Sequence, residues 1–272
     1  MANKAKKSVT EYAGFDDAVK AAEEVLSYIE AHKANEITAE QVTAAKTLIR
    51  EKGWMSVTDF RGIFGIAFSE NMSAKMETVT ALSTSCIVNP FCLARMRNGD
   101  NICANCFSVG LQLFKPHVRE NTIENFKVLN TVVIPAMFWP LVCNDMLRFE
   151  AFGDLYTWKQ VANYFECAKR NKGTRCALWT KNPEIIAEAI RRGYKKPSNL
   201  IIVYSSPKKN TIAEREKLLA MYPFIDKIFT VFEEDFIKAN NIDINCGARS
   251  CRGCQRCYHK TKELEFINER KK

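Results

Sequence analysis

Leu200-Ile201-Ile202-Val203-Tyr204 is a strongly apolar segment, and the fold class is inferred from it and its neighbours. A short apolar run that is rich in β-branched residues predicts a strand. A helical pattern over residues 211–221 follows it, and the run at residues 227–232 predicts a second strand. The stretch is therefore one unit of an alternating strand–helix pattern.

The same alternation extends toward the N-terminus. Strands are expected over residues 76–84, 147–152 and 176–180, and helices over residues 118–129, 156–169, 183–192 and 233–239. Successive strand–helix units predict a parallel β/α architecture, either a partial (β/α) barrel or an open doubly wound sheet. Residue patterns alone leave both arrangements open.

Residues 1–60 predict a helical accessory hairpin, and residues 61–272 a cysteine-rich β/α domain. Helical periodicity covers residues 15–32, and Thr38 with Gln41 fits a capping box that starts a second helix. Residues 1–85 carry 10 basic and 12 acidic side chains, whereas the whole chain has a net charge of +9. This asymmetry favours two parts.

The chain has 11 cysteines and only three histidines. No apolar signal segment is apparent near the N-terminus, and Pro135 and Pro140 interrupt the longest apolar run, so we expect a cytoplasmic protein without a membrane span. Thiols stay reduced in that compartment. Clustered cysteines are then better explained as metal ligands than as disulfides.

Two groups of four cysteines stand out, and the remaining Cys143, Cys167 and Cys176 are expected in the core. The groups are Cys86, Cys92, Cys103 and Cys106, and Cys246, Cys251, Cys254 and Cys257. The second group has the Cys-x2-Cys-x2-Cys spacing that holds [4Fe–4S] clusters in ferredoxins. A zinc ion with four cysteine ligands is the alternative. The first group follows the first predicted strand and either leaves one iron open or closes its site.

Polar residues follow the other predicted strands. They are Gly153-Asp154, Thr180-Lys181-Asn182, Ser205-Ser206-Pro207 and Glu233-Glu234-Asp235. In parallel β/α folds the loops after the strands share one edge, so we expect these residues to converge with the first cysteine group. The simpler alternative is that they only form turns.

Residues 64–260 resemble the gene product 88 family of phages and prophages. The resemblance is carried by Cys103-Ala104-Asn105-Cys106-Phe107-Ser108, Arg119-Glu120-Asn121 to Asn125, Arg148-Phe149-Glu150-Ala151-Phe152-Gly153-Asp154, Leu178-Trp179-Thr180-Lys181-Asn182 and the cysteine run that starts at Cys246. It implies a layout similar to radical S-adenosylmethionine enzymes, and hence a partial barrel.

The radical S-adenosylmethionine layout also implies a cofactor site, although the usual Cys-x3-Cys-x2-Cys spacing is absent here. By this resemblance Asp154 would bind the amino group of S-adenosylmethionine, and Lys181, Ser205 or Ser206 its carboxylate or ribose. The alternative for Asp154 is a turn residue that caps the helix expected at residue 156.

Several function classes are excluded or disfavoured. Phosphate loops, dinucleotide-binding glycine motifs and His-Glu-x2-His are absent. Our first hypothesis is an iron–sulfur protein with one or two [4Fe–4S] clusters that acts on an unknown small or macromolecular substrate. The second is a zinc-stabilised protein that binds nucleic acid through residues 246–272, which hold 8 basic and 3 acidic side chains. The third is a structural accessory protein.

Overall fold

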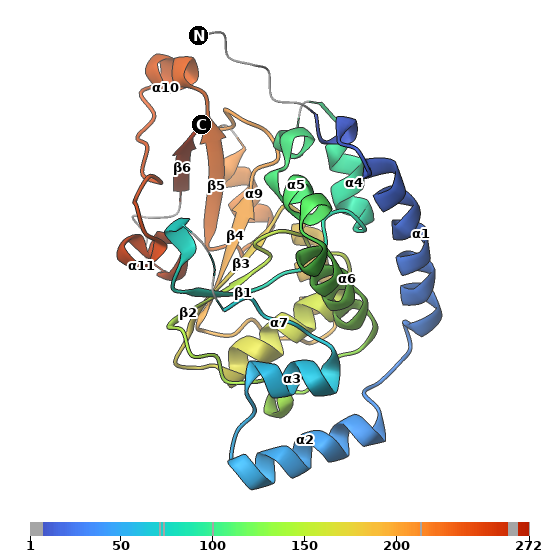
Figure 1. Cartoon of the computed structure of the whole chain (residues 1–272). Helices are drawn as coiled ribbons and strands as arrows, with labels where there is room; N and C mark the ends of the chain where they lie inside the picture. The colour runs from blue at the N-terminus through green and yellow to red at the C-terminus, as the bar shows by residue number, and fades with distance from the viewer. Residues whose placement is uncertain are drawn as a thin grey trace.

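A computed structural model describes residues 8–70, 72, 74–99, 101–212, 214–260 and 266–271. Its centre is one six-stranded, all-parallel sheet with the strand order β1-β2-β3-β4-β5-β6 (Figure 1). The strands are β1 Val79–Leu82, β2 Met146–Phe149, β3 Arg175–Thr180, β4 Leu200–Ser205, β5 Lys227–Phe232 and β6 Phe266–Arg270. Strands β1 and β6 are the edges, so the sheet is not closed into a barrel. The predicted parallel β/α fold is confirmed.

Helices connect and flank the strands. They are α1 Phe15–His32, α2 Ala39–Lys52, α3 Val57–Phe64, α4 Pro90–Met96, α5 Phe107–Phe114, α6 Pro116–Thr131, α7 Trp158–Arg170, α8 Pro183–Arg191, α9 Arg215–Met221, α10 Glu234–Asn240 and α11 Cys251–Cys254. Three of the short 3-10 helices matter below: η2 Ala74–Met76, η3 Ile102–Asn105 and η5 Arg256–Tyr258. None of the described helices is long and apolar enough to cross a membrane.

The two faces of the sheet are covered differently. Leu82, Phe149 and Leu178 point to the outer face, where they pack in the main core with residues of α6, α7 and α8. Each of these three side chains is fully buried, which contributes roughly 1.5–3 kcal/mol per side chain. Because side chains alternate along a strand, their neighbours form a second, inner face.

The inner face is covered by the C-terminal part of the chain. Val79, Met146 and Ala177 are buried there against Tyr258 of η5, with Cys251 and Cys257 packed alongside. In Figure 1 the short helix α11 accordingly lies beside the edge strands β1 and β6, on the side opposite α6. The cysteine run therefore fills the inner face of the open sheet.

The two predicted N-terminal helices are present. Thr38 and Gln41 form the predicted capping box, and Gly53 ends α2 with a φ of 79°. Helix α1 packs on α6, whereas α2 packs on α3 and projects away from the sheet (Figure 1). Each helix thus has its own partner in the body of the protein.

Two local expectations were wrong. The strand expected over residues 147–152 ends at Phe149, because Glu150 takes a left-handed φ of 57° and turns the chain out of the sheet. Residues 266–270 belong to the basic segment 246–272, in which no strand was expected, and they form the edge strand β6 beside β5. Short edge strands with charged residues are a common way to prevent edge-to-edge aggregation, and they look polar in sequence.

Candidate functional site

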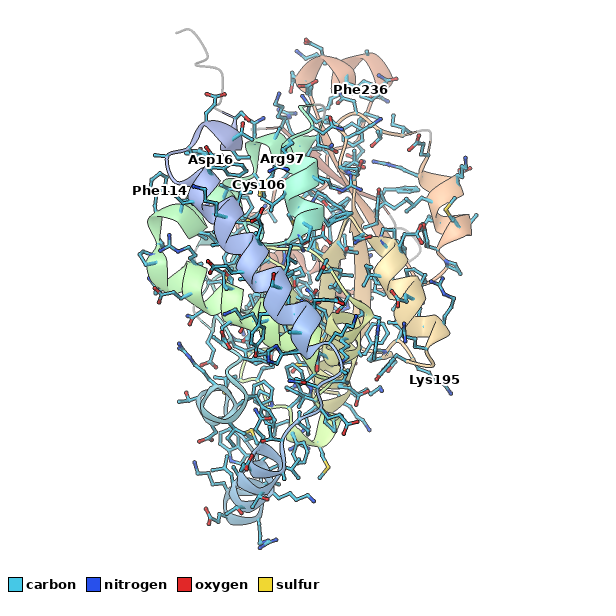
Figure 2. The ribbon with its side chains drawn as sticks, turned by 90° about the vertical axis from the view of Figure 1, so that its right-hand side faces the viewer. Asp16, Arg97, Cys106, Phe114, Lys195 and Phe236 are labelled. Carbon is cyan, nitrogen blue, oxygen red and sulfur yellow. The ribbon has the colours of Figure 1, made fainter. Side chains whose placement is uncertain are left out.

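The first cysteine loop, residues 86–106, leaves the C-terminal end of β1 and folds over that edge of the sheet. Cys92 lies in α4, Cys103 in η3, and Cys106 is the N-cap of α5. Figure 2 shows Cys106 in the upper part of the molecule, in the region of α1, α4 and α5. Cys86 and Cys92 are buried, whereas Cys103 and Cys106 are partly exposed. The loop thus places four thiols at the strand ends, as the sequence predicts.

Cys86 and Cys106 are direct partners. The hydrogen bond from Cys86 lowers the pKa of Cys106 to about 6, whereas burial raises the pKa of Cys86 well above its usual value. The Gln112 side-chain amide donates to the Cys86 sulfur at 3.3 Å, and Ser85 donates to Gln112 at 2.7 Å. Gln112 of α5 therefore fixes the position of Cys86 in this pair.

The other two thiols of the loop lie near Asp154 and Lys181. Burial raises the pKa of Cys92 well above its usual value, and the negative charge of Asp154 adds to this rise. Burial also raises the pKa of Cys103, and the positive charge of Lys181 opposes that rise. The same edge thus brings cysteines, an acid and a lysine together.

Asp154 joins the ends of β2 and β3. Its carboxylate accepts hydrogen bonds from the Leu155 amide at 2.8 Å, from the Lys181 amide at 2.9 Å and from the Thr180 hydroxyl. It does not cap α7, which begins at Trp158 after Thr157. Through these three hydrogen bonds the Asp154 carboxylate holds the ends of β2 and β3 together. Its predicted binding of a ligand amino group stays a prediction.

Lys181 and Ser205 also meet at this edge. The Lys181 ammonium donates to the Ser205 hydroxyl at 3.2 Å, which joins the ends of β3 and β4. Ser206 instead forms hydrogen bonds within its own loop, to the Lys208 carbonyl and the Thr211 hydroxyl, each at 2.8 Å. Of the four predicted cofactor-binding residues, Asp154, Lys181 and Ser205 therefore come together, and Ser206 turns away.

Sequence reasoning missed Glu150, which is buried directly behind this edge. Its carboxylate accepts hydrogen bonds from the Thr84 amide at 3.2 Å, from the Gln160 amide at 2.7 Å and from the Tyr164 hydroxyl. Burial raises the pKa of Glu150 to about 7. Its position immediately after the β2 run was the signal available in the sequence.

Gly153 allows the chain to approach this network closely. A Cβ atom at Gly153 would lie 2.5 Å from the Thr84 hydroxyl oxygen and 2.6 Å from the Thr84 carbonyl oxygen. Distances under 3 Å exclude any side chain unless the backbone moves. The Gly-Asp pair is therefore required by packing at the sheet edge.

The second cysteine segment, residues 246–257, forms a separate site on the inner face. All four of its cysteines, Cys246, Cys251, Cys254 and Cys257, line one small cavity of about 40 Å³. Cys246 is held to β6 by its amide, which donates to the Asn268 carbonyl at 3.0 Å. Ser250 caps α11 by accepting from the Gly253 amide. The sequence spacing thus brings the four thiols together around one space.

Positive charges stand on two sides of this cavity. Burial raises the pKa of Cys257 to about 12, and the positive charge of Arg148 opposes this rise. Burial also raises the pKa of Cys251, against the opposing charges of Lys75 and Arg148. A metal cation that binds here would displace the thiol protons, and the resulting thiolates would then sit between two cations.

Arg148 and Trp179 also belong to the inner face and were not identified from the sequence. The Arg148 guanidinium stacks on the Trp179 ring, and it donates to the Met76 sulfur at 3.5 Å. Arg148 Nε and Trp179 Nε1 are buried without a hydrogen-bond partner among the described residues. Arg148 and Trp179 are each one residue before the end of their strand, and nothing in the local sequence indicates that the second cysteine segment packs beside them.

Of the three remaining cysteines, two lie in the core. Cys167 and Cys176 are fully buried in the main core, as expected. Cys143 is exposed, and this expectation was wrong. Cys143 lies in the loop before β2 rather than in a periodic element, so no helix or strand face turns it inward.

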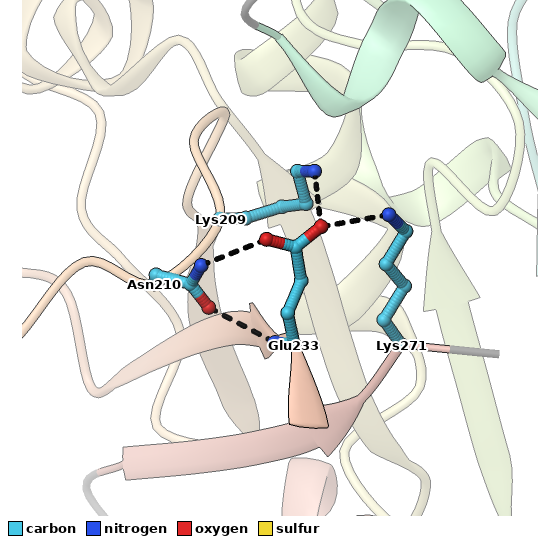
Figure 3. A network of polar contacts seen from close by, with 4 residues as sticks. All are labelled: Lys209, Asn210, Glu233 and Lys271. Carbon is cyan, nitrogen blue, oxygen red and sulfur yellow. Dashed lines mark hydrogen bonds and ion pairs between the residues drawn. The ribbon is translucent and has the colours of Figure 1, made fainter. Parts of the chain in front are cut away.

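Glu233, which follows β5, forms an ion-pair network at the surface. Its carboxylate binds Lys209 at 2.6 Å, Lys271 at 2.7 Å and the Asn210 amide at 3.1 Å (Figure 3). The hydrogen bonds from Lys209 and Lys271 lower the pKa of Glu233 to about 2. These contacts fix the loop after β4 to β6, so Glu233 serves the structure of this edge.

The donors fit a metal–thiolate centre in type and number. Four sulfur ligands suit a zinc ion or an iron–sulfur cluster. As the side chains stand, however, no group of three or more His, Cys, Asp or Glu residues in the described part of the chain is arranged as a metal site. Ligation at either cysteine group would therefore require side-chain rotation toward the bound metal.

Comparison of the chain with protein-family models, with curated proteins and with solved structures finds no significant match. The function must therefore be argued from the residues and the geometry of the sites.

Proposed function

We propose that this chain is an iron–sulfur protein with one cluster at each cysteine group and with its reactive edge at the C-terminal ends of the strands. The observation that supports this most is the cavity lined by all four cysteines of the second segment. Cys-x2-Cys-x2-Cys spacing in a segment held to β6 gives a sulfur-only donor set, which iron–sulfur clusters use.

The first cysteine loop supplies the second half of the proposal. Its thiols stand at the sheet edge where parallel β/α proteins place their sites, beside Lys181 and Ser205. We propose S-adenosylmethionine as the cofactor of this edge, in line with the resemblance to the gene product 88 family. A cluster bound here would supply electrons. The chain would supply the Lys181 ammonium for a carboxylate and the Ser205 hydroxyl for a polar group of the ligand.

Zinc at the second segment is the competing proposal. It is favoured by the donor set, since the four cysteines that line the cavity match the four ligands of a structural zinc site. Zinc there would hold the segment on the inner face and contribute to folding.

The test is metal and sulfide analysis of protein that has been purified without oxygen. We expect iron and acid-labile sulfide in equal amounts, and a visible absorption band that changes when S-adenosylmethionine is added. A colourless protein with one zinc ion per chain would overturn the iron–sulfur proposal. Bound clusters with no spectral change on addition of S-adenosylmethionine would overturn only the proposal that S-adenosylmethionine is the cofactor.

Cysteine-to-serine variants show which of the two cysteine groups binds the metal. Cys251→Ser with Cys254→Ser should remove the metal of the second segment, and Cys103→Ser with Cys106→Ser that of the first loop. The exposed Cys143 provides the matched control, because Cys143→Ser also removes a thiol but lies outside both groups.

A further inference from the structure

The cavity of the second cysteine segment adjoins a groove on the protein surface, with which it shares lining residues. This groove is open and has a volume of about 660 Å³. Cys254 lines both the cavity and the groove, together with the small residues Gly247 and Ala248. These shared residues therefore form the boundary between the groove and the cavity.

The rim of the groove is positively charged. Arg249 and Arg256 line it, and Arg252 is exposed on α11 beside it. The ion pairs of Lys75 with Glu269 and of Lys260 with Asp226 do not include these arginines. Within the described part of the chain, their charge is thus available to a partner.

A groove of this kind suits transfer of electrons to another protein. Charge around a surface patch steers a partner of opposite charge and sets its orientation, and the effect falls with ionic strength. A partner in the groove would lie close to the second cysteine group, because Cys254 lines both the groove and the cavity. Nucleic acid would also be attracted by the arginines, but it would have no use for a redox site beside the groove.

We propose that this groove binds the acidic face of a one-electron carrier protein, such as a flavodoxin. The inference rests on the proposed function, because it requires a redox-active metal at the second cysteine segment. In the transfer step the reduced carrier loses one electron and the metal centre gains it. No bond forms or breaks, and no proton needs to move.

The experiment uses the metal-loaded chain and a flavodoxin as the probe. Binding is measured by titration calorimetry, and electron transfer by stopped-flow absorbance. The test variant is Arg249→Glu with Arg252→Glu. The matched control is Arg191→Glu with Lys195→Glu, which changes the charge equally at exposed residues on the end of α8 and in the following turn. Helix α8 packs in the main core on the outer face, and Figure 2 labels Lys195.

We expect the test variant to weaken flavodoxin binding about tenfold or more at low salt and to slow electron transfer, and the control to match the wild type. Wild-type binding should also weaken as salt is raised. Reduction by dithionite, a small inorganic reductant, should be equally complete in all three proteins. Equal flavodoxin binding by both variants would overturn the proposal.

Two further outcomes are distinguishable. If dithionite reduces no metal centre in the wild type, the proposed function fails, and the docking proposal fails with it as an electron-transfer site. If the centre is reducible, but a single-stranded oligonucleotide rather than flavodoxin loses affinity in the test variant, the groove binds nucleic acid and the docking proposal alone is overturned.

Discussion

The guanidinium carbon of Arg148 lies 4.2 Å from the centre of the Trp179 ring, on the inner face of the sheet. Arg148 acts electrostatically on Cys251 and Cys257 of the second segment. Trp179 is followed directly by Thr180, whose hydroxyl donates to Asp154 at the sheet edge. Trp179 and Thr180 are consecutive residues of β3. The stacked pair beside the second cysteine group is therefore only one residue away from a contact of Asp154, which lies beside the first group.

Replacement of Arg148 should affect the second site without unfolding the protein. Arg148→Met removes the stacking on Trp179 and the charge beside two cysteines, and we expect a loss of about 1 kcal/mol in the free energy of unfolding. The reduction potential of a metal centre at the second segment should fall, because a nearby positive charge favours the more negative, reduced state. Potentiometric titration measures this. Arg148→Lys, which keeps the charge, should restore most of the potential; equal potentials in all three proteins would contradict it.

Gly153→Ala should destabilise the fold. The added methyl group would meet the Thr84 carbonyl oxygen at 2.6 Å, so the backbone at the end of β1 must shift, at a cost of about 1–3 kcal/mol. Urea denaturation measures the change. Gly173→Ala is the control, since a Cβ atom there meets nothing within 4 Å. Equal stability of the two variants would contradict this prediction, because it would mean that the backbone at the sheet edge can shift at little cost.

Glu150 should make stability depend on pH in a defined direction. Its pKa of about 7 in the folded chain is above the ordinary value of about 4.3, so the folded state binds this proton more tightly. The resulting stabilisation is present below about pH 4.3 and is lost as the pH rises through 7, by up to about 4 kcal/mol. Urea denaturation of metal-free wild type and Glu150→Gln over this range measures it. As the pH rises, the wild type should lose stability relative to Glu150→Gln. A difference in the free energy of unfolding that does not change with pH would contradict the raised pKa of Glu150.

Glu233 should behave in the opposite way. Its pKa of about 2 lies below the ordinary value, so its stabilisation is present above about pH 4.3 and is lost as the pH falls toward 2. Because the side chain is 38% exposed, Glu233→Gln should cost less than about 1 kcal/mol at neutral pH. The cost should shrink in high salt, as thermal denaturation with and without salt will show. Glu234→Gln, whose partners are more exposed, is the matched control.

Much of the fold could be predicted because the buried strands are apolar in sequence. The run at residues 200–204 became β4 and the run at residues 227–232 became β5, since parallel strands covered on both faces need apolar side chains throughout. Strand β6 could not be predicted in this way. It is an edge strand with Asn268, Glu269 and Arg270 in a charged region, so its pairing depends on β5 rather than on its own composition.

From the sequence, only the part of the candidate site that lies at the ends of the strands could be predicted. Lys181 directly follows β3, Ser205 is the last residue of β4, and Asp154 lies in the loop after β2. The shared edge of a parallel sheet brings the three together. Lys75 and Arg148 could not be found from spacing. Lys75 lines the second cavity, and Arg148 acts on its cysteines, only because residues 246–257 return to the inner face. That long-range contact has no local sequence signal.

The backbone hydrogen bond from the Ile102 amide to the Pro207 carbonyl, 2.8 Å long, gives the first cysteine loop a fixed point. The ten residues between Cys92 and Cys103 are thereby divided into the end of α4 and a short span that is tied to the loop after β4. Loop-closure entropy grows slowly with length, by about 0.6 kcal/mol per doubling, so such an insertion is inexpensive once it is anchored. Wide spacing in the sequence is therefore compatible with a cysteine loop whose backbone is anchored to the sheet edge, and a ligand that moves the loop after β4 would move Cys103 with it.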